Sequence, residues 1–180
     1  MITPIVKYIL KKRSKESDRL SSLVHGDLIM KMAVVAVFSE DESFSHMQSY
    51  VNELRKRGLK EVDFYVYFSS KKLLQKSQPN KKNIVFSNAD LNLLGKYKSE
   101  SLIESLKKNY DVLIDLTRGK ALACDVLVSK LKASWKTGAY DADRTYLLDF
   151  MIDVKDEKDV RKLIHHLDHY ITNFNKSEAA

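Results

Sequence analysis

Two short polar segments carry the residue types that could bind a small molecule or act on it. The first follows an apolar run and consists of Asp115, Thr117, Arg118, Gly119 and Lys120. Guanidinium and ammonium groups pair with phosphates and carboxylates, and the free N–H groups at the start of a helix attract the same anions. We therefore expect an anion-binding loop here. The structural alternative is that Thr117 caps the following helix and Arg118 pairs with a neighbouring acid.

The second segment is acidic and runs in the order Ser39, Glu40, Asp41, Glu42. A carboxylate from Glu40 or Asp41 that faced the first segment could act as a general base. Acidic residues in a first helical turn are also what the helix dipole favours without any function. The sequence assigns no catalytic residue and no cofactor, and it leaves open whether the chain is an enzyme.

Several well-known patterns of catalytic and binding residues are missing. The five glycines form neither the G-x-G-x-x-G dinucleotide fingerprint nor the P-loop. No serine stands in a G-x-S-x-G nucleophile elbow. His165, His166 and His169 avoid the apolar stripe of the last helix, which favours a solvated face over a metal site, so we predict no bound metal.

The segments around these loops predict the scaffold that must position them. Six runs have the composition of β-strands, at 32–38, 62–68, 83–86, 112–116, 134–138 and 148–154. The first and fourth are apolar without a polar face, as in central strands buried on both sides. Segments with helical spacing lie between most of the strands. This alternation predicts an open, mostly parallel, Rossmann-like α/β sheet of five to six strands with helices on both faces.

Polar residues mark the expected helix ends. Ser39 with Glu42 resembles a capping box, and Gly58 after three basic residues predicts a helix that ends in the left-handed conformation. The last helix is expected to begin near Asp156, where acidic residues suit its first turn.

In such a sheet the carboxyl ends of the strands meet at one edge, and ligands bind there at the reversal of strand order. The two polar segments follow the two strands expected at the centre, so they should face each other across a crevice. We predict a site for an anionic small molecule, with the candidate ligand-binding residues Glu40, Asp41, Asp115, Thr117, Arg118 and Lys120.

The positive charge of the chain is concentrated in two places. The net charge is +7, while residues 1–20 hold six basic and two acidic side chains and residues 71–82 hold five lysines and no acid. This suggests a second function, a non-catalytic interaction module whose basic arm and lysine loop contact an acidic partner such as RNA, a membrane surface or a protein. Only Tyr67 and Phe68 are near enough to the lysines to stack on RNA bases. The structural alternative is that the loop lysines are solvated and that the arm is a helix docked on the domain edge or a frayed segment.

Length and composition predict a single domain. The 180 residues, 44% apolar and 31% charged, suffice for one hydrophobic core. We assign 1–25 to a basic arm or helix, 26–175 to the α/β domain and 176–180 to a disordered tail. One cysteine, Cys124, and the lack of an apolar run of about 20 residues predict a cytoplasmic protein with a buried thiol. The oligomeric state stays open.

Four motifs occur in a fixed order along the chain, namely Phe86–Ser99, Tyr110–Thr117, Lys136–Tyr140 and Asp149–Asp153. Together they resemble a family of uncharacterised bacterial proteins, a domain of unknown function. The likeness runs from about residue 33 to residue 170. It implies a shared fold and names no activity.

A weaker resemblance concerns Asp111–Leu116 and Trp135–Tyr140. These strands and the helix between them are similar to the N-terminal half of heptosyltransferase-like glycosyltransferases. Such enzymes bind their nucleotide-sugar donor mainly through a second Rossmann-like domain. This chain has no residues left to build one, so a complete transferase is not expected.

Overall fold

The central element of the protein is one six-stranded sheet. The computed structural model describes residues 6, 8–12, 21–77, 79–92, 95–154 and 159–173. Within these, the strands are β1 (Lys31–Val37), β2 (Glu61–Tyr67), β3 (Asn83–Phe86), β4 (Asn109–Asp115), β5 (Lys132–Ala139) and β6 (Phe150–Ile152). Every neighbouring pair is parallel, and the order is β3-β2-β1-β4-β5-β6. The predicted Rossmann-like α/β sheet is confirmed.

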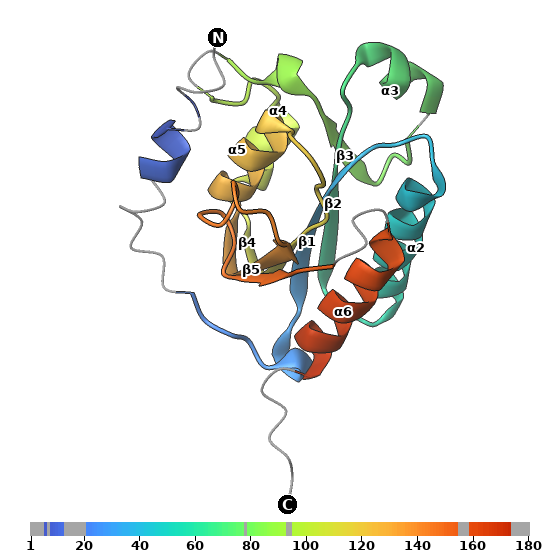
Figure 1. The fold of residues 1–180 in the computed structure, drawn as a ribbon. Helices are drawn as coiled ribbons and strands as arrows, with labels where there is room; N and C mark the ends of the chain where they lie inside the picture. The colour runs from blue at the N-terminus through green and yellow to red at the C-terminus, as the bar shows by residue number, and fades with distance from the viewer. Residues whose placement is uncertain are drawn as a thin grey trace, which may run out of the picture.

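Helices cover both faces of this sheet, as Figure 1 shows. One face packs against α2 (Glu42–Lys56), α3 (Lys71–Ser77) and α6 (Val160–Asn173). The other packs against α4 (Glu100–Ser105) and α5 (Leu122–Lys130). Two 3-10 turns complete the regular structure, η1 (Gly26–Leu28) and η2 (Asn88–Asp90).

The two central strands are buried from both sides. In β1, Ala33 and Val35 enter the core beneath α5, whereas Val34 and Ala36 enter the core beneath α2 and α6. All four side chains are completely buried. Strand β4 pairs directly with β1, so the prediction that the two apolar runs lie side by side in the middle of the sheet is confirmed.

The start of α2 differs from the sequence prediction. The N-cap of α2 is Asp41 and not Ser39, since the Asp41 Oδ1 accepts the Ser43 N–H at 3.0 Å. Ser39 instead donates its hydroxyl to the same oxygen at 2.6 Å. Gly58 follows the end of α2 at φ +82°, as predicted. Asp156, where the last helix was expected to begin, lies outside the described residues, as does the tail at 176–180.

The lysine loop at 71–82 contains a short helix, which its composition did not predict. This helix is α3, and its Leu73 and Leu74 are partly buried against the core beneath α2. Tyr67 and Phe68, the residues expected to stack on RNA bases, are only 6% and 1% exposed. Both rings fill the core, so they are not exposed for base stacking.

The described part of the N-terminal arm is docked on the domain. Residues 8–12 are helical, and Val6 and Leu10 are buried in the same core as α5. Tyr8 points outward and is 69% exposed. The apolar side of this helix is therefore occupied by the protein itself.

Candidate functional site

The strand order reverses between β1 and β4, and a hollow lies beyond the carboxyl ends of these strands. Its volume is about 500 Å³, and its lining includes Ser39, Asp41, Ser43, Leu116 and Arg118. Ser39 follows β1, and Leu116 and Arg118 follow β4. This is where ligands bind in open α/β sheets, so the fold creates the predicted crevice.

A second hollow adjoins the carboxyl ends of β4, β5 and β6. Its volume is about 530 Å³, and its lining includes Thr117, Arg118, Tyr140, Asp141 and Asp153. Arg118 lines both hollows, because it leaves the sheet at the end of a central strand. The side chain thus stands between two spaces of ligand size.

A backbone contact from the residue that precedes α6 helps to hold Arg118. Its Nη2 donates to the carbonyl oxygen of Asp159 at 3.3 Å. Gly119 follows at φ +74° with open space around its Cα, so the chain turns sharply at a position that favours glycine. The loop therefore holds Arg118 at the edge of the sheet.

Asp115 does not face either hollow, because it is committed to a buried ion pair. Its Oδ2 lies 2.6 Å from Nη2 of Arg144, and its Oδ1 accepts the Thr117 N–H at 2.9 Å. Arg144 also donates from Nε to Asp125 at 2.8 Å. Burial opposes the charge of Arg144, but the two carboxylates outweigh it and raise the pKa of the guanidinium. Asp115 therefore has a structural role: it holds Arg144 and the backbone of Thr117 in place next to the site.

Thr117 lines the second hollow and does not cap a helix. Helix α5 begins at Leu122, with Ala121 as its N-cap. Thr117 is 2% exposed, and its Oγ1 is buried beside the thiol of Cys124. The capping role considered for Thr117 is therefore wrong, and Lys120 is exposed outside the lining of both hollows.

The two acids predicted after β1 have different roles. Glu40 points away from the crevice and pairs with Lys76 of α3 at 2.6 Å, with both side chains largely exposed. Asp41 lines the first hollow but also caps α2. The hydrogen bond from the Ser39 hydroxyl lowers the pKa of Asp41, so this carboxylate is ionised at neutral pH. An anion bound to Arg118 must avoid it.

The structure places Asp41 with Arg118 at the first hollow and Thr117 with Arg118 at the second, and the second hollow adds three residues that sequence reasoning missed. Tyr140, Asp141 and Asp153 all follow β5 or β6 at the same edge of the sheet. The rule that selected Asp115 and its neighbours, applied to the outer strands, would have found them. No local pattern pointed to Arg144, whose partners are 29 and 19 residues away.

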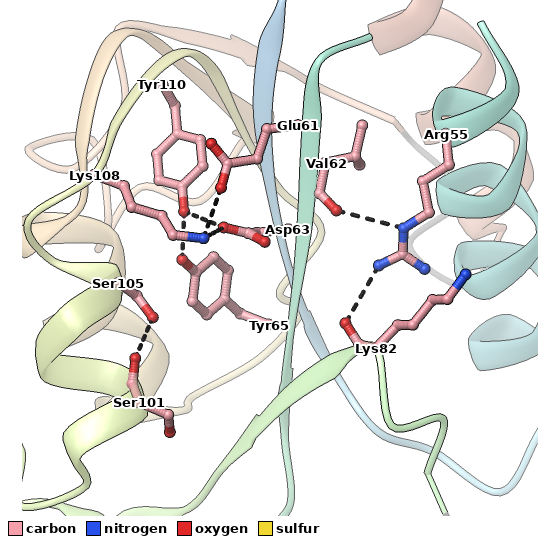
Figure 2. Close-up of polar contacts among 10 residues, drawn as sticks. All are labelled: Arg55, Glu61, Val62, Asp63, Tyr65, Lys82, Ser101, Ser105, Lys108 and Tyr110. Atoms are coloured by element: carbon pink, nitrogen blue, oxygen red, sulfur yellow. Dashed lines mark hydrogen bonds and ion pairs between the residues drawn. The ribbon is translucent and has the colours of Figure 1, made fainter. Parts of the chain in front are cut away.

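A separate polar cluster lies at the other end of the strands, where β2 and β4 begin (Figure 2). The Asp63 Oδ2 accepts hydrogen bonds from Lys108 and Tyr110, each at 2.6 Å. Lys108 also donates to Glu61 at 2.7 Å, and the hydroxyls of Tyr65 and Tyr110 lie 2.6 Å apart. Residues 61, 63 and 65 share one face of β2 because strand side chains alternate. The cluster ties β2 to β4 across β1, a structural role.

The part of the chain that the structure describes has neither a candidate metal centre nor a membrane-spanning helix. No group of three or more His, Cys, Asp or Glu side chains is placed to hold a metal ion there. His165, His166 and His169 are exposed on α6. No described helix combines the length and the apolar character needed to cross a membrane. Cys124 is completely buried, as predicted.

Comparison with known proteins gives one match. A model described as a family of unknown function, DUF6913, matches residues 3–174. The chain belongs to this family. Neither a curated protein nor a solved structure matches the DUF6913 chain. The resemblance to heptosyltransferases receives no support from these comparisons, and it stays a prediction.

Proposed function

We propose that this DUF6913 protein binds a small molecule at the carboxyl edge of its sheet and that Arg118 pairs with an anionic group of the ligand. The observation that carries this proposal is the position of Arg118 in the lining of both hollows, next to the reversal of strand order. A guanidinium binds carboxylates and phosphates through two parallel N–H···O bonds. Arg118 is therefore the anchor of the ligand.

The surroundings of Arg118 suit a ligand of modest size. Ligand pockets typically measure about 300–1,000 Å³ and combine apolar walls with a few polar groups. The hollow beyond β1 and β4 has apolar walls from Met47, Leu116 and Val160, and Ser43 adds a hydroxyl group. We assign no reaction. A hydroxyl and a carboxylate, those of Ser39 and Asp41, do meet at this hollow, but the same carboxylate oxygen caps α2, so the pair serves the start of the helix.

The interaction module is the weaker candidate. A helix that lies on a membrane needs a free apolar side, but Val6 and Leu10 are buried against the domain. An RNA-binding loop needs rings for base stacking, but Tyr67 and Phe68 are buried. What remains is a set of exposed lysines on and beside α3, which would bind an acidic partner by charge alone.

A thermal-shift screen with nucleotides, sugar nucleotides, phosphorylated metabolites and amino acids tests the proposal. We expect at least one compound to raise the Tm of the wild-type protein and to lose that effect in Arg118→Ala. Lys132→Ala is the matched control. It removes one exposed positive charge at the start of β5, at the end of the strand away from the hollows. It should respond to the compound as the wild type does.

Two outcomes would contradict the proposal. One is a stabilising compound whose effect survives in Arg118→Ala. The other is no response to any compound, together with salt-dependent binding to heparin that is lost when Lys71, Lys72, Lys81 and Lys82 are changed to alanine. The second outcome would favour the interaction module, since contacts through exposed lysines weaken steeply with salt.

A further inference from the structure

The hollow beyond β4, β5 and β6 is lined by side chains of both charges. Arg118 reaches it from the loop after β4, Asp141 from the segment after β5 and Asp153 from the segment after β6. Each charged residue follows a different strand. The three groups therefore line one space from separate parts of the sheet edge.

This distribution disfavours a ligand that carries only negative charge. Among the described lining residues, two carboxylates and one guanidinium border a space of about 530 Å³. Like charges that share so small a space repel each other, and opposite charges attract. Asp141 and Asp153 would repel an anion held by Arg118, whereas a positive group on the same ligand would be attracted to them.

The remaining lining fits an elongated molecule with an apolar middle. Ala139, Ile152 and Val154 supply apolar wall between the charged groups. The Tyr140 ring is 53% exposed beside them, so it can contact a hydrocarbon stem or a cation.

The Asp141 carboxylate can accept further hydrogen bonds at this hollow. The Thr117 hydroxyl does not contribute, because its oxygen is buried and lies beside the thiol of Cys124. The carboxylate of Asp141 accepts a hydrogen bond from the Asp143 N–H at 2.8 Å, and a carboxylate can accept several.

We infer that the ligand is a small molecule with one carboxylate and at least two amino groups. A basic amino acid is the simplest example. Its carboxylate pairs with Arg118, its amines pair with Asp141 and Asp153, and its methylene stem lies along the apolar wall. This inference rests on the proposed function and names the ligand class of the same site.

The test compares three probes by isothermal titration and by amide chemical shifts of the folded, full-length protein at pH 7. L-lysine carries both charges, inorganic phosphate carries only negative charge, and 1,5-diaminopentane carries only positive charge. We expect L-lysine to bind at least tenfold more tightly than either of the others. Its binding should shift the amide signals of Gly119, Asp141 and Asp153.

Variants then separate the two ends of the ligand. The double variant Asp141→Asn, Asp153→Asn should weaken L-lysine binding at least tenfold without weakening phosphate binding. Arg118→Ala should weaken both. Glu53→Gln removes an exposed carboxylate on α2, away from the hollow, and should bind L-lysine as the wild type does. Circular dichroism and the Tm verify that each variant is folded.

The results separate two claims: that the ligand is a zwitterion, and that Arg118 binds a ligand at all. Binding of phosphate or a nucleotide through Arg118, with weaker or no binding of L-lysine, would overturn the zwitterion and leave the proposed function standing. Equal binding of L-lysine to the wild type and the double aspartate variant would also overturn the zwitterion. No Arg118-dependent binding of any probe, or of any compound in the screen, would overturn both.

Discussion

Arg144 forms an ion pair with Asp115 across 2.6 Å in the interior of the protein, where they are 4% and 0% exposed. The same guanidinium contacts Asp125 of α5 and the carbonyl oxygen of Thr117 at 3.3 Å. Arg144 therefore connects the segment after β5 to the end of β4 and to α5. That segment also carries Tyr140 and Asp141, so the buried pair fixes one wall of the proposed site.

Replacing Arg144 with methionine should destabilise the protein by about 3–5 kcal/mol, because Asp115 and Asp125 would remain buried without a counter-charge. Urea unfolding followed by circular dichroism measures this loss. Arg144→Lys should also be destabilised, because one ammonium cannot reproduce the planar contacts to both carboxylates. Arg161→Ala, which removes a largely exposed arginine, should change stability by less than about 0.5 kcal/mol. Equal stability of Arg144→Met and Arg161→Ala would show that the buried pair contributes little.

Gly138→Ala should destabilise the protein by about 1–3 kcal/mol, because the added methyl group overpacks the contact between β4 and β5. A Cβ at this position would lie 2.4 Å from the backbone oxygen of Asp115 and 3.1 Å from its Cβ. Gly58→Ala is the comparison, since a Cβ there meets nothing within 4 Å and only the positive φ of 82° is unfavourable. That change should cost about 1 kcal/mol. A smaller loss at Gly138 than at Gly58 would contradict the close approach of the strands.

Stability should decrease as the pH rises above about 9. Burial raises the pKa of Cys124 from 9.0 and that of Tyr97 from 10.0, so in this range the unfolded chain loses protons that the folded protein keeps. Each such group then favours unfolding by about 1.4 kcal/mol per pH unit. Chemical unfolding at pH 7, 9 and 10.5 measures the slope. Cys124→Ala should lose stability less steeply above pH 9 and in parallel with the wild type at pH 6–7. A flat profile up to pH 10.5 would contradict the burial of these groups.

The cluster in Figure 2 predicts unequal roles for its two acids. One oxygen of Asp63 accepts hydrogen bonds from both Lys108 and Tyr110, whereas Glu61 meets Lys108 near the surface. Asp63→Ala should cost about 2–3 kcal/mol, because a charged acceptor of two hydrogen bonds is lost. Glu61→Ala should cost at most about 1 kcal/mol, as a partly exposed ion pair does. Unfolding of the two variants in urea under the same conditions tests the difference, and equal losses would contradict it.

Hydrophobic patterning predicted the fold well because it depends on short-range periodicity. The runs at 32–38 and 112–116 have no polar face, and only the centre of a covered parallel sheet buries both sides of a strand. The helix end at Gly58 could be predicted for a similar reason, because the basic residues just before the glycine are typical of a helix C-terminus. The capping box at Ser39 failed by two residues, because Asp41 is an equally good cap and lies next to the first helical turn.

The candidate site was harder to predict because its geometry depends on distant partners. The sequence places Asp115 at the end of a central strand, but it gives no sign that Arg144 folds back onto it from 29 residues away. Glu40 and Asp41 are adjacent in the chain, yet one turns toward Lys76 and the other toward the crevice. Only tertiary structure decides which of two neighbouring acids faces a ligand.

The lengths of the outer strands have a consequence for how the molecule behaves in concentrated solution. β3 has 4 residues and β6 has 3, whereas each of the four inner strands has at least 7. A neighbouring molecule that added a strand at either border would gain few main-chain hydrogen bonds. Short borders of this kind discourage growth into filaments or aggregates.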